Sequence, residues 1–191
     1  MLAKPFALVG LLATSLSAAA LGPRAGDEVL PASEIGDFEG FTFLGEVPNP
    51  HAYITTNVSD TTALDSRGII SKRDSCFWWW NSLATFRTFI ARDFANALQS
   101  ASNAHTWYAL NRGTCLKWQT GTEVRICACN DYVFENTHFK PWEAGWGTKN
   151  RLDACCGGAF DCRGGDITGH GDSGLQIRIT TWSPLGLGNG C

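Results

Sequence analysis

SLATFRTFIARDFANALQS, residues 82–100, carries the clearest periodic pattern of the chain. Charged and polar residues separate apolar ones that recur at steps of three and four, namely Leu83, Phe86, Phe89, Ile90, Phe94, Ala97 and Leu98. This spacing predicts an amphipathic helix that buries one face, with Asn81 or Ser82 as its N-cap.

Two short aromatic and β-branched runs follow this helix. TWYAL (106–110) and TCLKW (114–118) flank the turn sequence Asn111-Arg112-Gly113. Runs of this kind on either side of a glycine turn are typical of a β-hairpin. We therefore expect the two runs to pair with each other.

Two later segments alternate between apolar and polar residues, as strands do. EVRICACN (123–130) places its aliphatic residues on one face, so Cys127 and Cys129 leave the sheet in the same direction, toward a neighbouring layer. LQIRITTW (175–182) alternates in the same way, which predicts a strand with one buried face.

The remaining segments complete a mixed fold. Residues 130–148 predict a long aromatic loop, KNRLDACC (149–156) predicts a short second helix after a Thr148 cap, and residues 157–174 are glycine-rich and irregular. One long helix, one short helix and a mostly antiparallel sheet make an α+β fold. We expect a disulfide-stapled α/β sandwich.

The first twenty residues resemble a targeting segment. Residues 1–20 combine an early Lys4, an apolar run and a small-residue end at Ala18-Ala19-Ala20. This arrangement predicts a secretory signal peptide, because the apolar run is too short to span a membrane. We expect the protein to be secreted and extracellular.

The dibasic pair Lys72-Arg73 lies where the composition changes. Residues 21–73 hold eight acidic and four basic residues, whereas residues 74–191 hold ten of each and all the cysteines and tryptophans. We expect 21–73 to be an acidic pro-segment that a kexin-type protease separates by cutting after Arg73, and 74–191 to be the mature domain. An ordinary N-terminal subdomain is the alternative. The sequon at Asn57 lies in the pro-segment, where a glycan would assist folding or export.

The mature domain is rich in cysteine. An even number of cysteines in a small secreted domain predicts four disulfides and no free thiol. Their spacing lacks the Cys-x-x-Cys pairs of zinc sites, so we expect no metal and no cofactor. The pairing stays open, because eight cysteines allow 105 connectivities. They are Cys76, Cys115, Cys127, Cys129, Cys155, Cys156, Cys162 and Cys191.

The charge of the mature domain bears on its partners. Its equal numbers of acids and bases give no case for binding nucleic acid or an anionic membrane surface. We expect a monomer.

Ser173 lies in GHGDSGL (169–175), which matches the sequence around the nucleophile of trypsin-like proteases. That scaffold needs about twice the length of this domain and a base histidine in a different context. Esterase nucleophiles precede a helix, whereas Ser173 precedes a predicted strand. We interpret Asp172-Ser173 as part of a turn.

The run Trp78-Trp79-Trp80, after Phe77, is the least ordinary feature of the sequence. Four consecutive large aromatic residues cannot all face inward on one strand, so at least one should be partly exposed. The run is either a core anchor or a binding surface. We take it, together with Trp142 and Trp146, as the candidate binding surface.

Other polar residues are weaker candidates. The acids of the mature domain could include a glycosidase pair, but we expect solvated surface for Asp131, Glu135, Glu143, Asp153, Asp161, Asp166 and Asp172. The mature histidines share no metal-ligand spacing and are interpreted as surface or loop residues; they are His105, His138 and His170.

The order of signal peptide, acidic pro-segment, dibasic site and cysteine-rich domain resembles the precursors of fungal secreted effectors and killer toxins. The mature domain resembles the small α/β-sandwich killer toxins of smut fungi, in its helix before the sheet, ICA (126–128), the later cysteine cluster and GLQIRIT (174–180). This resemblance implies a protein that binds a host or competitor protein or membrane component and is not an enzyme.

Two other classes of function stay open. A small secreted hydrolase would show a pocket with two facing acids or a contact between a serine and a histidine. A carbohydrate- or cell-wall-binding module would show an exposed row of coplanar aromatic rings.

Overall fold

The computed structural model describes residues 23–50, 52, 75–77, 84–168, 177–185 and 191. The described chain folds into a main sheet of six strands in the order β2-β6-β7-β11-β10-β3, and every neighbouring pair in it is antiparallel. The strands are β2 (Thr42–Pro48), β3 (Ser75–Cys76), β6 (Thr114–Thr120), β7 (Val124–Asn130), β10 (Gly165–Thr168) and β11 (Ile177–Trp182).

Two smaller sheets flank the main one. The first has the order β1-β5-β8, in which β1 and β5 run parallel, and the second is the pair β4-β9. Their strands are β1 (Val29–Leu30), β4 (Phe86–Arg87), β5 (Trp107–Leu110), β8 (Thr137–Phe139) and β9 (Asp161–Cys162).

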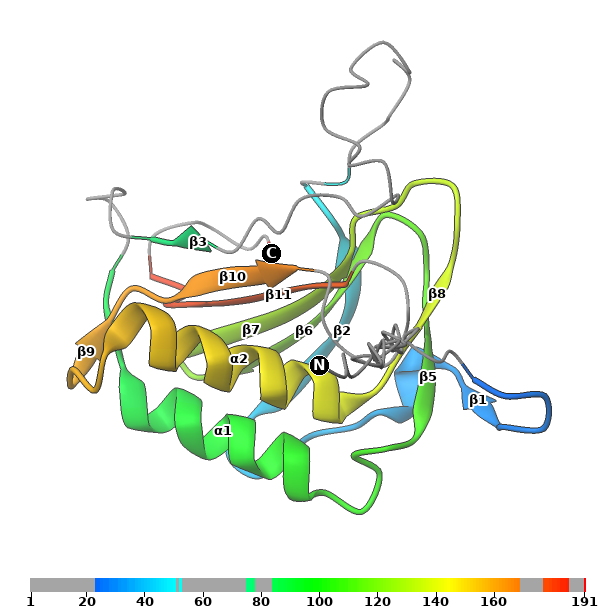
Figure 1. Cartoon of the computed structure of the whole chain (residues 1–191), viewed down its shortest axis with the longest axis horizontal. Helices are drawn as coiled ribbons and strands as arrows, with labels where there is room; N and C mark the ends of the chain where they lie inside the picture. The colour runs from blue at the N-terminus through cyan, green and yellow to red at the C-terminus, as the bar shows by residue number, and fades with distance from the viewer. Residues whose placement is uncertain (1–22, 51, 53–74, 78–83, 169–176, 186–190) are drawn as a thin grey trace, which may run out of the picture.

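The helices form a second layer on the main sheet. Helices α1 (Thr88–Ser100) and α2 (Pro141–Cys156) lie side by side, and α2 packs against β10 and β11 (Figure 1). A short 3-10 turn, η1 (Ala32–Glu34), precedes β2. The prediction of an α+β sandwich with a mostly antiparallel sheet is confirmed. None of the described helices is long and apolar enough to cross a membrane.

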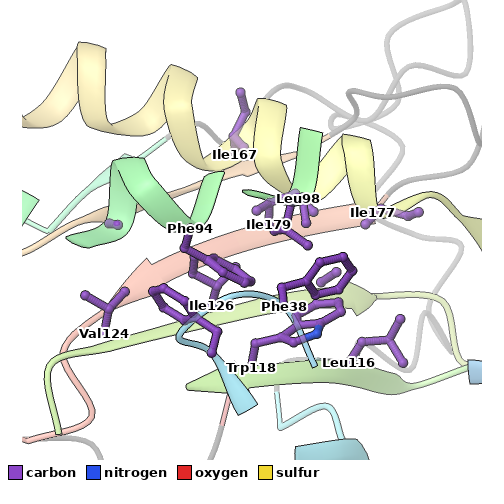
Figure 2. Packing of buried hydrophobic residues seen from close by; sticks show 14 of the residues in the cluster. Phe38, Phe94, Leu98, Leu116, Trp118, Val124, Ile126, Ile167, Ile177 and Ile179 are labelled. Carbon is purple, nitrogen blue, oxygen red and sulfur yellow. The ribbon is translucent and has the colours of Figure 1, made fainter. Parts of the chain in front are cut away.

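The core lies between the helices and the main sheet. Figure 2 shows Phe94 and Leu98 of α1 above Trp118 and Ile126 of the sheet, and all four side chains are fully buried. Phe38, from the segment before β2, lies 6.3 Å from both Phe94 and Trp118, measured between ring centroids. Helix and sheet therefore share one apolar core.

The first predicted helix is shorter than the periodicity indicated. Helix α1 begins at Thr88 with Arg87 as its N-cap, so the prediction of Asn81 or Ser82 at this position was wrong. Phe86 and Arg87 are extended because they pair with β9. The spacing of apolar residues contains no information about this pairing with a distant strand. It also predicted that Phe89 lies on the buried face of the helix, whereas Phe89 is 46% exposed.

The second helix is twice as long as predicted. Helix α2 covers the C-terminal half of the expected aromatic loop and begins at Pro141, not after Thr148. Gly145 and Gly147 lower the helix propensity of residues 141–148, so this half of the helix was not predicted. Both glycines are required by packing: a Cβ on Gly145 would lie 2.6 Å from the Ala95 carbonyl oxygen of α1, and one on Gly147 would lie 2.8 Å from Ile179 of β11.

The hairpin predicted for residues 106–118 does not form. Strands β5 and β6 belong to different sheets, and β6 instead forms a hairpin with β7. Gly113 does have the positive φ of a turn glycine, 63°. Glu46 of β2 holds this corner by accepting hydrogen bonds from the Asn111 backbone N–H at 3.0 Å and side-chain amide at 2.7 Å. The turn signal was therefore right, but it marks a change of sheet.

The strands predicted within residues 123–130 and 175–182 are confirmed as β7 and β11, but every residue of both is buried, so the prediction of a single buried face for the second strand was wrong. Cys129 of β7 bonds to Cys115 on the adjacent strand β6, so the prediction that it links to another layer was wrong. Cys127 bonds to Cys191. Residues 157–174, expected to be irregular, include β9 and β10.

Residues 23–50 belong to the same fold as the cysteine-rich part. Strand β2 is an edge strand of the main sheet, and Ile35, Phe38 and Phe41 lie in the shared core. The change of composition at Arg73 is therefore not a boundary of the fold. The cut after Arg73 stays a prediction, because Lys72 and Arg73 lie outside the described residues, as do residues 1–20 and Asn57.

Candidate functional site

Two tryptophans on α2 and one histidine form a row of rings, which we call the aromatic strip: His105, Trp142 and Trp146. The two indole rings lie 6.4 Å apart between centroids and only 16° from parallel. The His105 ring lies 6.0 Å from Trp142 at 27°. Both tryptophans are half-buried and His105 is exposed, so the outer side of the strip faces solvent.

The start of α2 places the strip. Lys140 is the N-cap, Pro141 occupies the first turn, and Glu143 returns its carboxylate to the Lys140 backbone N–H at 3.4 Å. The Trp142 backbone N–H donates to the Ala104 carbonyl oxygen at 3.0 Å, which ties the helix to the loop after α1. Residues four apart on a helix share a face, so Trp146 lies beside Trp142.

Trp107, two residues after His105 of the strip, has a structural role. Trp107 is 6% exposed. Its ring contacts His138 edge-on at 6.2 Å, and the Lys140 ammonium lies 4.1 Å from the ring centroid. This cation–π contact covers the indole and fixes Lys140 beside the strip.

The strip offers flat apolar surface with polar edges. An indole ring has a π face that accepts cations, C–H groups and other rings, and it has one N–H donor at its edge. Tryptophan is also one of the residues that most often dominates binding energy at protein interfaces. The arrangement is suited to recognising a ligand by stacking.

The structure brings together only part of the predicted binding surface. Trp142 and Trp146 are neighbours, whereas Trp78, Trp79 and Trp80 lie outside the described residues. Phe77, which opens that run, packs on Trp182 at 6.1 Å between centroids. Ser173, Asp172 and His170 also lie outside the described residues.

All eight cysteines form disulfides, as predicted. The pairs are Cys76–Cys155, Cys115–Cys129, Cys127–Cys191 and Cys156–Cys162. The sulfurs of Cys115, Cys129 and Cys191 lie within 4.8 Å of one another. Because they belong to two neighbouring disulfides, none of the three is a thiolate that could bind a metal.

Two acids differ from the solvated surface that was expected. Glu143 is fully buried at the start of α2. The Asp131 side chain is 16% exposed and accepts hydrogen bonds from Arg178 at 3.0–3.2 Å. Asp153, by contrast, is 57% exposed in its ion pair with Arg92. Glu143 and Asp131 therefore stabilise the fold through specific partners.

The sheet face that carries two of the disulfides also carries two buried cations. Lys117 and Arg125 are 8% and 4% exposed. Burial, together with the charge of Arg125, lowers the pKa of Lys117. Arg125 donates to the Gln119 side-chain oxygen at 2.8 and 3.0 Å. In the loop after β7, burial and the charge of Glu135 raise the pKa of Tyr132.

An exposed pair of aromatic residues outside the strip was not predicted from the sequence. Phe89 and Phe160 are 46% and 66% exposed, and their ring centroids lie 5.9 Å apart. Arg87 places its guanidinium carbon 5.4 Å from the Phe89 ring centroid. Phe89 was assigned to the buried face of the helix and Phe160 to an irregular segment, so no sequence pattern predicted their contact.

Comparison of the chain with protein-family models, curated proteins and solved structures gives no match. The assignment of the site therefore rests on its geometry.

Proposed function

We propose that this protein is secreted and acts by binding a target, in the manner of fungal effectors and killer toxins, with the aromatic strip as its contact surface. The single observation that carries the proposal is the solvent-facing row formed by His105, Trp142 and Trp146. Proteins seldom leave stacked tryptophans at the surface without a binding role, because they are costly to expose to water.

Secretion is supported by the four disulfides. Such bonds form and persist in oxidising compartments, and they allow a small domain to keep its fold outside the cell. The rigid scaffold also holds the strip in place, because α2 is tied to β3 by Cys76–Cys155 and to β9 by Cys156–Cys162. A preorganised surface loses less entropy on binding.

One target class has a specific observation in its favour. Trp142 and Trp146 are stacked within 16° of parallel, and the outward π face of a stacked indole can pack on the C–H face of a sugar ring. Binding to a cell-wall polysaccharide is therefore the second candidate function, beside binding to a host or competitor protein or membrane component.

The test compares Trp142→Ala with Phe134→Ala, a matched control. Phe134 is 62% exposed and lies outside the strip. Each variant is infiltrated into plant tissue, spotted on fungal lawns and sedimented with insoluble chitin, β-glucan and cellulose, and a thermal melt checks its fold.

We expect Trp142→Ala to reduce the response at least about tenfold, as loss of a binding hot spot does, with little change in melting temperature. Loss of sedimentation would identify a polysaccharide target, and loss of only the tissue or lawn response would identify a protein or membrane target. Equal activity of the two variants would refute the strip as the contact surface.

A further inference from the structure

Residues 23–50, which we call the N-terminal segment, are part of the fold. Only the polypeptide backbone connects them covalently to the rest of it. All eight cysteines lie beyond residue 75. A cut between the segment and β3 would therefore leave two chains joined by no disulfide. What holds them together then depends on the contacts of the segment alone.

Two strands of the segment complete two sheets. Strand β2 pairs antiparallel with β6 from Thr42↔Gln119 to Pro48↔Thr114, and β1 pairs parallel with β5. Without β2, strand β6 would become the edge of the main sheet and present unpaired backbone N–H and C=O groups. Such an edge promotes aggregation.

The segment also fills the core next to α1. The Phe41 ring lies 3.8 Å from the Phe94 ring between centroids, and Phe43 lies 5.4 Å from Trp118. Figure 2 shows Phe38 above Trp118 in the same cluster. Phe94 and Trp118 are fully buried only with these rings in place, so loss of the segment would expose a large apolar surface.

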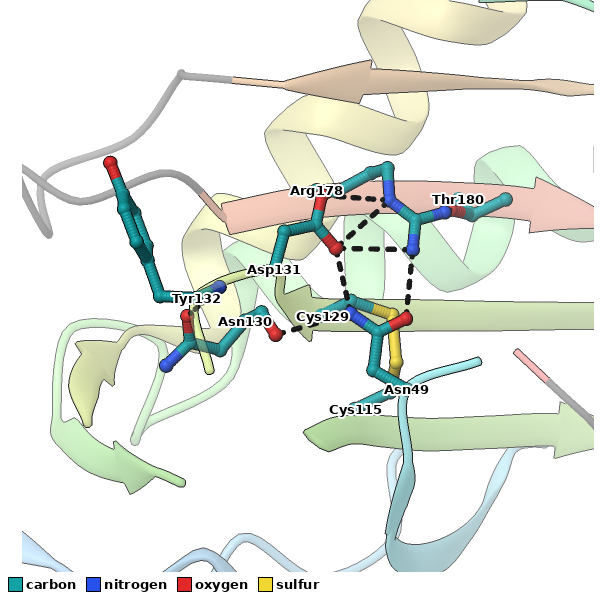
Figure 3. Close-up of polar contacts among 8 residues, drawn as sticks. All are labelled: Asn49, Cys115, Cys129, Asn130, Asp131, Tyr132, Arg178 and Thr180. Carbon is teal, nitrogen blue, oxygen red and sulfur yellow. Dashed lines mark hydrogen bonds and ion pairs between the residues drawn. A yellow bond between two sulfur atoms is a disulfide. The ribbon is translucent and has the colours of Figure 1, made fainter. Parts of the chain in front are cut away.

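The end of the segment is fixed by a buried polar network, drawn in Figure 3. The Asn49 amide donates to the Asp131 carboxylate at 2.7 Å and to the Asn130 carbonyl oxygen at 3.1 Å. Its oxygen accepts from the Arg178 guanidinium at 3.1 Å. Asn49 is 7% exposed, and removing it would leave buried donors and acceptors without this partner.

We infer that pairing and packing with β5, β6 and α1 keep the N-terminal segment, residues 23–50, bound after processing, so that the mature protein consists of two non-covalently associated chains. This inference rests on the proposed cut after Arg73. Its consequence is that the functional unit includes residues 23–50 and that the separated 74–191 chain lacks an edge strand and part of its core.

The test cuts the full-length, disulfide-bonded protein independently of the native site. A recognition sequence for a specific protease replaces a stretch between residues 53 and 71, and the protein is cleaved to completion. At micromolar concentration we expect both fragments to elute in one peak in size-exclusion chromatography, to give the summed mass in native mass spectrometry, and to separate on a non-reducing denaturing gel. Elution of the fragments in separate peaks would overturn the inference.

Two variants test whether the described contacts hold the segment. Phe41→Ala removes a 4% exposed ring that contacts Phe94, and Leu44→Ala, the control, removes a 46% exposed side chain of β2. After cleavage we expect Phe41→Ala to weaken the association by about a hundredfold or more and Leu44→Ala to leave it nearly unchanged. Equal retention of the segment in both variants would contradict the packing argument.

The native cut is examined separately. N-terminal sequencing of the secreted protein should find Asp74 as one of its N-termini. An uncut secreted chain would refute the proposed processing, whereas retention of the segment would still be decided by the engineered cut. If Phe41→Ala fails to fold, the cleaved wild-type protein alone decides the inference.

Discussion

Gly145→Ala separates the two forces that act on helix α2. By intrinsic propensity, alanine in a helix is better than glycine by about 1 kcal/mol, so the substitution should stabilise the protein. By packing it should destabilise, because the added Cβ would lie 2.6 Å from the Ala95 carbonyl oxygen, 2.8 Å from Gln99 Cγ and 3.1 Å from Leu98 Cβ. The sign of the change in unfolding free energy shows which force is larger.

The geometry favours packing. The Gln99 side chain can rotate away, but the Ala95 oxygen belongs to the backbone of α1 and moves only if the two helices separate. Overfilling a packed interior typically costs about 1–3 kcal/mol, and a clash with a backbone atom lies at the upper end of that range. After the gain in propensity is subtracted, we expect a net loss of about 2 kcal/mol, which corresponds to a fall of roughly 4–8 °C in melting temperature.

The assay is thermal and urea unfolding of the disulfide-bonded protein, followed by circular dichroism. Lys149, exposed on the same helix, supplies the control: the difference between Lys149→Gly and Lys149→Ala measures propensity without packing and should favour alanine by about 1 kcal/mol. If Gly145→Ala is as stable as the wild type or more stable, the close approach of α1 and α2 does not explain this glycine.

Three further predictions concern the cross-links and the buried charges. Removing Cys76–Cys155 by a double change to serine should cost about 4–5 kcal/mol, because the bond closes a loop of 79 residues, and an unfolding free energy within 1 kcal/mol of the wild type would contradict this. Asp131→Ala leaves the guanidinium of Arg178, whose side chain is 10% exposed, without its carboxylate, and we expect a loss of about 3 kcal/mol in urea unfolding; an unchanged midpoint would disprove the role of the pair. Burial lowers the pKa of Lys117 below 10.5, so the unfolded state binds its proton more tightly, and the stability of the wild type relative to Lys117→Met should rise as the pH is raised from 8 to 10.5. A difference that does not change with pH would refute this last assignment.

Local patterns predicted the features that local physics controls. The alternation of EVRICACN and of IRITTW predicted β7 and β11, because successive side chains on a strand point to opposite faces whatever the strand packs against. The number of cysteines predicted four disulfides, because an even count in a small cysteine-rich domain allows every thiol to pair. The aromatic content of residues 130–148 singled out Trp142 and Trp146 without indicating that a helix carries them.

The tertiary structure decided what depends on distant residues. Helix α2 contains glycine at positions 145 and 147 because α1 and β11 leave no room there for a side chain. Helix propensity describes single residues and takes no account of these neighbouring elements. His105 joins the aromatic strip only because the Trp142 backbone is hydrogen-bonded to Ala104.

The N-terminal segment shows most clearly that composition does not predict tertiary contacts. The change of charge and cysteine content at Arg73 predicted a boundary between two units there. The fold is not divided at that point, because Phe43 pairs with Trp118 across more than seventy residues of sequence. Backbone pairing and burial depend on which surfaces meet in three dimensions, whereas composition describes each segment by itself.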